Sequence, residues 1–221
     1  MGVVKKWILY KNIIKDLKGT SVINKNMEPF VLKVKPICLH PTIDNIQEYE
    51  YSHFCILPMS VLEELDKNGL IDNNPYTFSI KTTNNIRDTY LSVLEFSSDN
   101  DTIYIPQMVM DNNFISLEDP VTIDYFYPPK GSEIIFQPED NTFHDLENNK
   151  EILEEYISYH YKILQLGDRI GFKYNEVEYN LEITHLEPCD VVLCHETEMI
   201  LDYRDSIINE CKDRQIEKQL I

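Results

Sequence analysis

Residues 89–114 constrain the fold more than any other part of this sequence. Two short runs, residues 91–96 and 102–105, are rich in branched and aromatic side chains, and the polar cluster SSDND separates them. This pattern predicts a β-hairpin. Pro106 has no N–H to donate, so it ends the second run, and one turn of helix is expected at residues 108–110. Because two strands and a helical turn cannot bury their apolar faces alone, the other strands of the chain must pack around them.

Short strands and one helix are predicted around this hairpin. Ser60 and Glu63 have the spacing of a capping box, so a helix should begin there and end at Gly69. Strands are expected at residues 30–39, 54–57, 76–81 and 121–126. Pro36 makes the first of these an edge strand or a bent strand, because proline cannot donate to a neighbouring strand.

A break at residues 128–131, with the sequence PPKG, is the candidate boundary between two lobes. After it, Asn148 and Glu151 have the spacing that caps a helix. Its core-facing positions would be Leu153, Tyr156, Ile157, Tyr161 and Leu164. Later strands are expected at residues 169–173, 177–183 and 191–194, the first two as a hairpin and the third as the last strand. The many short strands and few helices indicate an α+β fold with a mixed second lobe.

Residues 3–18 predict an amphipathic helix with lysines beside its apolar face. The apolar positions are Val3, Trp7, Tyr10, Ile14 and Leu17. One interpretation is that this helix packs on the acidic domain of its own chain. The other is that it docks on a partner or on an anionic membrane surface. For partner docking, the candidate contacts are Trp7, Tyr10, Ile14 and Leu17.

The formal charge of −18 is distributed unevenly along the chain. Residues 1–35 hold eight lysines against two acids, so the rest of the chain is the acidic part. We expect no nucleic-acid partner, because phosphate binding needs clustered lysine and arginine. A basic or neutral protein surface suits this body better. We also expect no transmembrane segment and no secretory signal, and therefore a cytoplasmic or nuclear protein.

Sequence motifs for catalysis and cofactor binding are missing. The chain has no glycine-rich phosphate loop, no nucleophile elbow and no His-Glu-x-x-His motif. Its five cysteines include no Cys-x-x-Cys pair, so buried free thiols are expected. A zinc set of His185, Cys189, Cys194 and His195 can be imagined, but its spacing matches no common zinc finger. We therefore expect no enzyme activity, no metal and no cofactor.

An ordered series of short motifs runs through residues 30–203. None is specific alone, but their order and spacing are. The series comprises LPMS at 57–60, VLEF at 93–96, YIP at 104–106 leading to MDN at 110–112, IFQP at 135–138, FHDL at 143–146, LQLGD at 164–168, YN at 174–175 with Tyr179, EP at 187–188 and LDY at 201–203. In this series the chain resembles the N-terminal domain of the ubiquitin fusion degradation protein 1 family.

The resemblance implies a double-psi β-barrel lobe at residues 28–120 and a smaller α+β lobe at residues 121–203. A helical extension at 1–27 and a charged tail at 204–221 would flank them. This arrangement is similar to the N-domain of the AAA+ ATPase that the family serves. The resemblance also implies a non-catalytic adaptor that binds ubiquitin or polyubiquitin and, with a partner adaptor subunit, presents tagged proteins to that unfoldase.

The sequence departs from the family at both ends. Residues 3–18 have no counterpart in the family, and its long C-terminal tail, which carries the unfoldase-docking motifs, is not matched after Tyr203. An alternative function is therefore a shortened paralogue that acts as a decoy or scaffold through its N-terminal helix, without binding ubiquitin. A third interpretation is an enzyme, because a barrel fold by itself does not settle function.

The second lobe offers candidate contacts for ubiquitin. The binding face of ubiquitin is apolar with a basic rim, so an apolar patch bordered by acids would suit it. The candidate residues are Tyr127, Phe136 and Phe143, with Glu133, Glu139 and Asp140 around them. The competing interpretation is that the aromatic residues belong to the core, and that the acid-rich interval 133–155 is a solvated surface.

Overall fold

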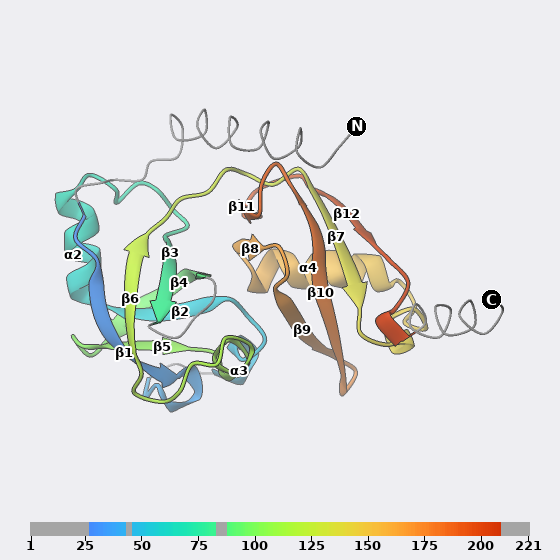
Figure 1. The fold of residues 1–221 in the computed structure, drawn as a ribbon, viewed down its shortest axis with the longest axis horizontal. Helices are drawn as coiled ribbons and strands as arrows, with labels where there is room; N and C mark the ends of the chain where they lie inside the picture. Colours follow the sequence, from blue (N-terminus) through green and yellow to red (C-terminus); the bar gives the residue numbers. More distant parts are fainter. Residues whose placement is uncertain (1–26, 43–45, 83–87, 209–221) are drawn as a thin grey trace, which may run out of the picture.

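The computed structural model describes residues 27–42, 46–82 and 88–208, and Figure 1 shows them as two lobes side by side. The helix predicted at residues 3–18, with its candidate contacts Trp7, Tyr10, Ile14 and Leu17, lies outside the described residues. The described chain is an α+β protein made mostly of strands. None of its described helices is long and apolar enough to cross a membrane.

The first lobe is a closed six-stranded barrel with the strand order β1-β5-β2-β4-β3-β6. Its strands are β1 (Phe30–Pro36), β2 (Phe54–Pro58), β3 (Thr77–Thr82), β4 (Thr89–Ser98), β5 (Thr102–Ile105) and β6 (Pro120–Tyr125). The helical elements are η1 (Ile37–Leu39), η2 (Ile46–Tyr49), α2 (Met59–Lys67) and α3 (Gln107–Asn112). Inward-facing side chains from four of these strands, Val34, Phe78, Ile103 and Ile123, are completely buried at the centre of the barrel.

The predicted hairpin is wrong, although both of its strands exist. Strand β2 lies between β4 and β5, parallel to β4 and antiparallel to β5. All five residues of β2 are buried, so this strand needs neighbours along both of its edges. The polar turn is closed locally instead, since the Ser98 hydroxyl donates to the Thr102 carbonyl at 2.7 Å. Helix α3 follows Pro106 as expected.

Strand β1 is not an edge strand. It pairs in parallel with β5 and antiparallel with β6, and Pro36 is its last residue, where the chain turns into η1. The residues before Pro36 therefore keep their N–H groups for the barrel.

The barrel extends further along the chain than expected. Strand β6 pairs with β1, where Val121 lies opposite Leu32, and with β3, where Ile123 lies opposite Ile80. It therefore closes the barrel between β1 and β3. The division expected between residues 120 and 121 therefore falls inside the barrel. The PPKG break at residues 128–131 follows β6 directly.

Neither predicted capping interaction forms, although both helices do. Helix α2 begins at Met59, and its N-cap is Pro58, which has no side-chain hydrogen bond to offer. Ser60 therefore lies inside the first turn. The helix ends before Gly69, whose φ of +68° is the left-handed conformation that favours glycine. Asn148 precedes α4 (Asn149–His160), but its own backbone is left-handed and its side chain caps nothing.

The second lobe consists of a four-stranded sheet with α4 behind it in Figure 1. The sheet has the order β12-β7-β10-β9, formed by β12 (Ile200–Tyr203), β7 (Glu133–Pro138), β10 (Val177–Glu187) and β9 (Arg169–Tyr174). The other elements are η3 (Asn141–Phe143) and a two-stranded sheet of β8 (Ile163–Gln165) and β11 (Val191–Leu193). The predicted β9–β10 hairpin is confirmed, but β11 is not the last strand, because β12 follows it.

The core of the second lobe lies between the four-stranded sheet and α4. Leu153 and Ile157 face it from the helix. Tyr161 and Leu164 are also buried there, as expected, but they lie beyond the end of α4. Both residues belong to the same hydrophobic cluster as Phe136 and Phe172.

The two lobes are joined by specific contacts around Tyr51 and His53. The Tyr51 hydroxyl donates to Glu178 at 3.0 Å, and the Tyr156 hydroxyl donates to the Tyr51 carbonyl at 3.2 Å. His53 Nδ1 lies 3.7 Å from Asp168 Oδ2, and both side chains are almost fully buried. These contacts connect the two lobes directly, and a groove lies beside them.

Candidate functional site

The three aromatic candidates do not form a surface patch. Phe136 is completely buried and Phe143 is 2% exposed, both within the core of the second lobe. The alternation of β7 points Ile134 and Phe136 into that core. Tyr127 is half-buried and packs against the core of the barrel instead. Direct contact of Phe136 or Phe143 with a partner is therefore ruled out, because each ring is covered by its own lobe.

The three acidic candidates lie at separate places on the second lobe. Glu139 forms an ion pair with Arg169 at 3.3 Å. Asp140 accepts the N–H of Thr142 at 2.8 Å and so caps η3. Glu133 lies on β7, where its carboxylate is within 4.8 Å of ligand atoms of His185 and Glu187. Glu133, His185 and Glu187 together offer three ligands, fewer than the four protein ligands of a structural zinc site.

The two thiols of the zinc set considered from the sequence, Cys189 and Cys194, donate hydrogen bonds to backbone carbonyls. The Cys194 thiol donates to the Tyr161 carbonyl at 3.0 Å, and the Cys189 thiol donates to the Val191 carbonyl at 3.0 Å. Burial raises the pKa of the Cys194 thiol to about 12. A metal ligand must be a thiolate, so this environment disfavours the form that would bind.

A groove of about 640 Å³ lies on the second lobe, between α4 with its preceding loop and the tip of the β9–β10 hairpin. We call it the acidic groove. Its apolar lining residues are Leu146, Ile152, Tyr174, Val177 and Tyr179. Its acidic lining residues are Asp145, Glu147, Glu151 and Glu155. The remaining lining residues are Thr142, Asn148 and Asn175, so no lysine, arginine or histidine of the described chain lines it.

Both walls of the acidic groove follow from regular local structure. Glu151 and Glu155 are one helical turn apart on α4 and therefore project from the same side. Across the groove, Tyr174 and Val177 are directly paired at the end of the hairpin. The two turn residues between them, Asn175 and Glu176, both have positive φ, as a tight type I′ turn requires. The hairpin tip thus presents two apolar side chains together.

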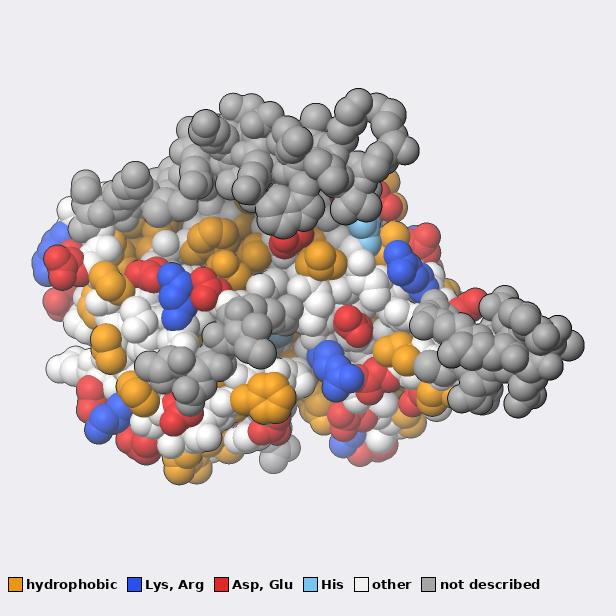
Figure 2. All heavy atoms as spheres, viewed as in Figure 1, with side chains coloured by type: hydrophobic (Ala, Val, Ile, Leu, Met, Phe, Trp, Pro, Cys, Tyr) orange, Lys and Arg blue, Asp and Glu red, His pale blue; other side chains and the backbone are white. Residues whose placement is uncertain are grey.

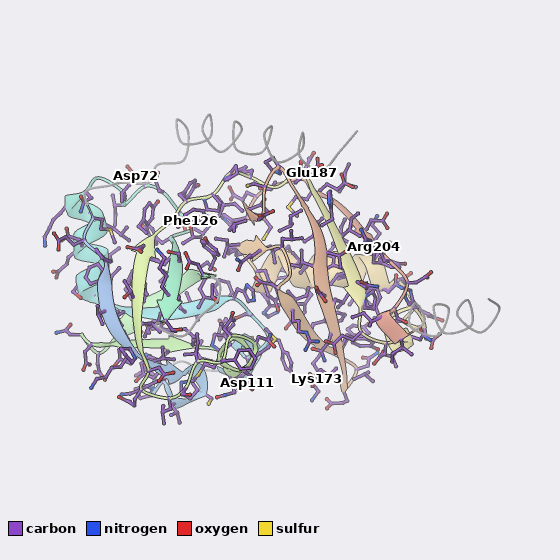
Figure 3. The ribbon with its side chains drawn as sticks, viewed as in Figure 1. Asp72, Asp111, Phe126, Lys173, Glu187 and Arg204 are labelled. Atoms are coloured by element: carbon purple, nitrogen blue, oxygen red, sulfur yellow. The ribbon has the colours of Figure 1, made fainter. Side chains whose placement is uncertain are left out.

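A second groove, of about 570 Å³, lies between the lobes, and we call it the interlobe groove. Its charged lining residues include Glu50 and Asp111 from the first lobe and Arg169 and Lys173 from the second. Figure 3 labels Asp111 and Lys173 where the two lobes meet, and Figure 2 shows acidic and basic side chains intermixed on this face. The interlobe groove therefore has no single sign of charge.

Glu50 also contributes to the raised pKa of a nearby thiol, which gives a testable prediction. Cys38 is exposed, and its pKa is raised by partial burial and by the charge and hydrogen bond of Glu50. We expect Glu50→Gln to speed alkylation of Cys38 at pH 8, because removing the negative charge lowers the pKa of the thiol and increases the thiolate fraction. Glutamine can still accept the N–H of Gln107, which now donates to Glu50 at 2.9 Å.

Peptide mass spectrometry would follow the labelling of Cys38 in this experiment. Glu48→Gln is the matched control, since Glu48 is an exposed neighbour that does not contribute to the pKa of Cys38. Equal labelling rates for both variants and the parent protein would contradict the assigned role of Glu50.

Comparison with known proteins finds two consecutive family matches. The family described as "Ubiquitin fusion degradation protein UFD1, N-terminal subdomain 1" matches residues 31–129, and its "N-terminal subdomain 2" matches residues 130–206. The first match covers the barrel and the second covers the four-stranded sheet with α4. The point where one match gives way to the other lies within the PPKG break.

Individual relatives have modest identity. The human "Ubiquitin recognition factor in ER-associated degradation protein 1" is 27% identical over 164 residues, which are 74% of this chain and 52% of the relative. The "Ubiquitin fusion degradation protein 1 homolog" of Dictyostelium discoideum is 26% identical over 148 residues, 67% of this chain and 44% of the relative. The "Ubiquitin fusion degradation protein 1" of Schizosaccharomyces pombe is 26% identical over 156 residues, 69% of this chain and 45% of the relative. The chain spans about half the length of these curated relatives.

Proposed function

The chain belongs to the ubiquitin fusion degradation protein 1 family, and we propose that it is a non-catalytic adaptor that binds ubiquitin or polyubiquitin. The observation that carries this proposal is the consecutive match of both N-terminal subdomains, which together span residues 31–206. The relative described as a ubiquitin recognition factor supports it. The strongly acidic composition is consistent with a partner whose binding face has a basic rim.

We further propose that the adaptor presents ubiquitylated proteins to an AAA+ unfoldase, together with a partner subunit, in the cytoplasm or nucleus. The barrel supports a likeness to the N-domain of such an ATPase, because β2 is inserted between β4 and β5 rather than following the order of the chain. We propose on this ground that the barrel is of the double-psi type. The division into lobes would then fall at the PPKG break.

An NMR titration with diubiquitin, of the linkage that marks proteins for degradation, tests ubiquitin binding. We expect saturable shifts in the labelled protein, confined to one lobe and weaker at higher salt, because charge attraction is screened. A basic protein of similar size serves as the control for non-specific attraction to the acidic body. An absence of shifts at high diubiquitin concentration would exclude the adaptor function.

Deleting residues 1–19 in the same experiment separates the adaptor from the decoy or scaffold alternative. The adaptor should keep its affinity for diubiquitin, because both family matches begin after this segment. A protein that acts through its N-terminal helix alone would show no diubiquitin binding with or without the segment.

A further inference from the structure

The acidic groove combines an apolar floor with a rim of one charge sign. Tyr174 and Val177 at the hairpin tip are 38% and 42% exposed, although both are apolar enough to favour burial. Leu146 and Ile152 lie half-buried on the opposite side. A partner face with an apolar centre would remove all four side chains from water.

The charge of this rim is uncompensated within the described chain. None of the four acids Asp145, Glu147, Glu151 and Glu155 forms an ion pair with another described residue. By contrast, Arg169 pairs with Glu139 beside the interlobe groove, and Lys173 pairs with Glu176 at the hairpin turn. Four like charges around one groove repel each other, and a basic partner rim would relieve that repulsion.

The groove is built before any partner arrives. The first residue of α4, Asn149, is tied to the preceding loop, because its side-chain amide donates to the Phe143 carbonyl at 3.2 Å. The Tyr203 hydroxyl donates to the Asn149 side-chain oxygen at 3.1 Å and ties this position to β12. On the other wall, the two-residue turn sets the position of the hairpin tip. A preformed site loses little conformational entropy on binding, so more of its contact energy appears as affinity.

We propose that the acidic groove is the surface that docks an apolar protein face bordered by lysine and arginine, and that this face belongs to ubiquitin. The inference rests on the proposed function, which names ubiquitin but not the surface that binds it. The charge pattern selects this groove over the interlobe groove, whose lining already mixes both signs.

Charge reversal at the rim tests the proposal. In the double variant Glu151→Lys with Glu155→Lys, the affinity for diubiquitin should fall by about tenfold or more, since like charges would then face the basic rim. Glu154→Lys is the matched control, because Glu154 is exposed on the same helix but does not line the groove. We expect this control to bind within about twofold of the parent protein.

A milder variant of this protein and a variant of diubiquitin keep the test independent of folding. Lysine at position 151 would oppose the helix dipole in the first turn of α4, so Glu151→Gln with Glu155→Gln gives a milder change that should weaken binding in the same direction. Diubiquitin whose basic rim is changed to glutamate should bind the double lysine variant better than it binds the parent protein. Circular dichroism and thermal melting establish that each variant is folded.

The outcomes separate this inference from the proposed function. If the parent protein binds diubiquitin but the groove variants bind equally well, ubiquitin docks elsewhere and the groove assignment is overturned while the adaptor function stands. If the parent protein does not bind diubiquitin, both are overturned. If deleting residues 1–19 shifts the groove resonances when no ubiquitin is present, the occupant is the lysine-rich segment of the chain itself, and the assignment to ubiquitin fails.

Discussion

Replacing Phe143 with alanine is expected to lower the free energy of unfolding of the second lobe by about 3–5 kcal/mol. The ring is 2% exposed and lies edge-on to Phe172, Tyr179 and Tyr203, with the closest ring centroid, that of Tyr203, at 5.2 Å. Alanine would leave a cavity among these rings and would remove the aromatic contacts as well. Urea denaturation followed by circular dichroism measures the change.

Tyr159→Ala is the matched control for this substitution. Tyr159 lies on α4 of the same lobe but is 67% exposed, so its loss should change stability by less than about 0.5 kcal/mol. Phe143→Ala should also weaken diubiquitin binding, but only to the extent that the lobe unfolds. A folded, equally stable Phe143→Ala variant that no longer binds diubiquitin would contradict the core position of this ring.

The second large effect is expected at Gly171, where β9 approaches the barrel. A Cβ atom at this position would lie 2.9 Å from Tyr51 Cδ1, 3.0 Å from Asn180 Oδ1 and 3.3 Å from Met108 Sδ. Tyr51 and Met108 belong to the first lobe, so a larger side chain would push the lobes apart. We expect Gly171→Val to destabilise the protein by about 1–3 kcal/mol, as overpacked interiors do.

NMR would show whether the interface is the affected place, because the resonances of Tyr51 and Glu178, which share a hydrogen bond, should shift. Gly69→Ala provides the contrast. Gly69 has a φ of +68° and no atom within 4 Å of its Cβ position, so alanine there would cost about 1–2 kcal/mol through backbone strain alone. A Gly171→Val protein with parent-like stability and unchanged interface resonances would refute the close-packing argument.

The sequence predicted where strands lie better than how they pair. Runs of branched and aromatic residues located β4 and β5, and a turn between two such runs located β9 and β10, because both signals are local properties of the chain. The insertion of β2 between β4 and β5 is not local, since residues 55 and 93 meet only in the closed barrel. The turn SSDND therefore resembled a hairpin turn although no hairpin forms there. The sequence also predicted where α2 and α4 begin, but not how they are capped. Pro58 and the left-handed Asn148 occupy the N-cap positions, and neither side chain makes a capping hydrogen bond.

None of the six residues predicted to contact ubiquitin lines the acidic groove. An apolar surface edged by acids does exist on the second lobe, and its four acids belong to the acid-rich interval 133–155. The aromatic candidates lie close to acids in the sequence, whereas Phe136 and Phe143 point to the core. The apolar groove residues come from segments about 25 positions apart, such as Ile152 and Val177, so only the packing of the hairpin tip against α4 could reveal them.

The strand order of the barrel determines when its parts can fold during synthesis. Strand β1 pairs with β5 and β6, with Lys33 opposite Thr102 and Leu32 opposite Val121, so it has no barrel partner until about 70 further residues have been made. Closing such long loops slows folding, and apolar strands made early remain exposed while they wait. The β9–β10 hairpin needs only its own two-residue turn, and a hairpin of this kind forms within about 1–10 μs. The barrel should therefore assemble as one late step once β6 has emerged from the ribosome, and a chaperone that shields β1 and β2 until then would protect the whole protein from aggregation.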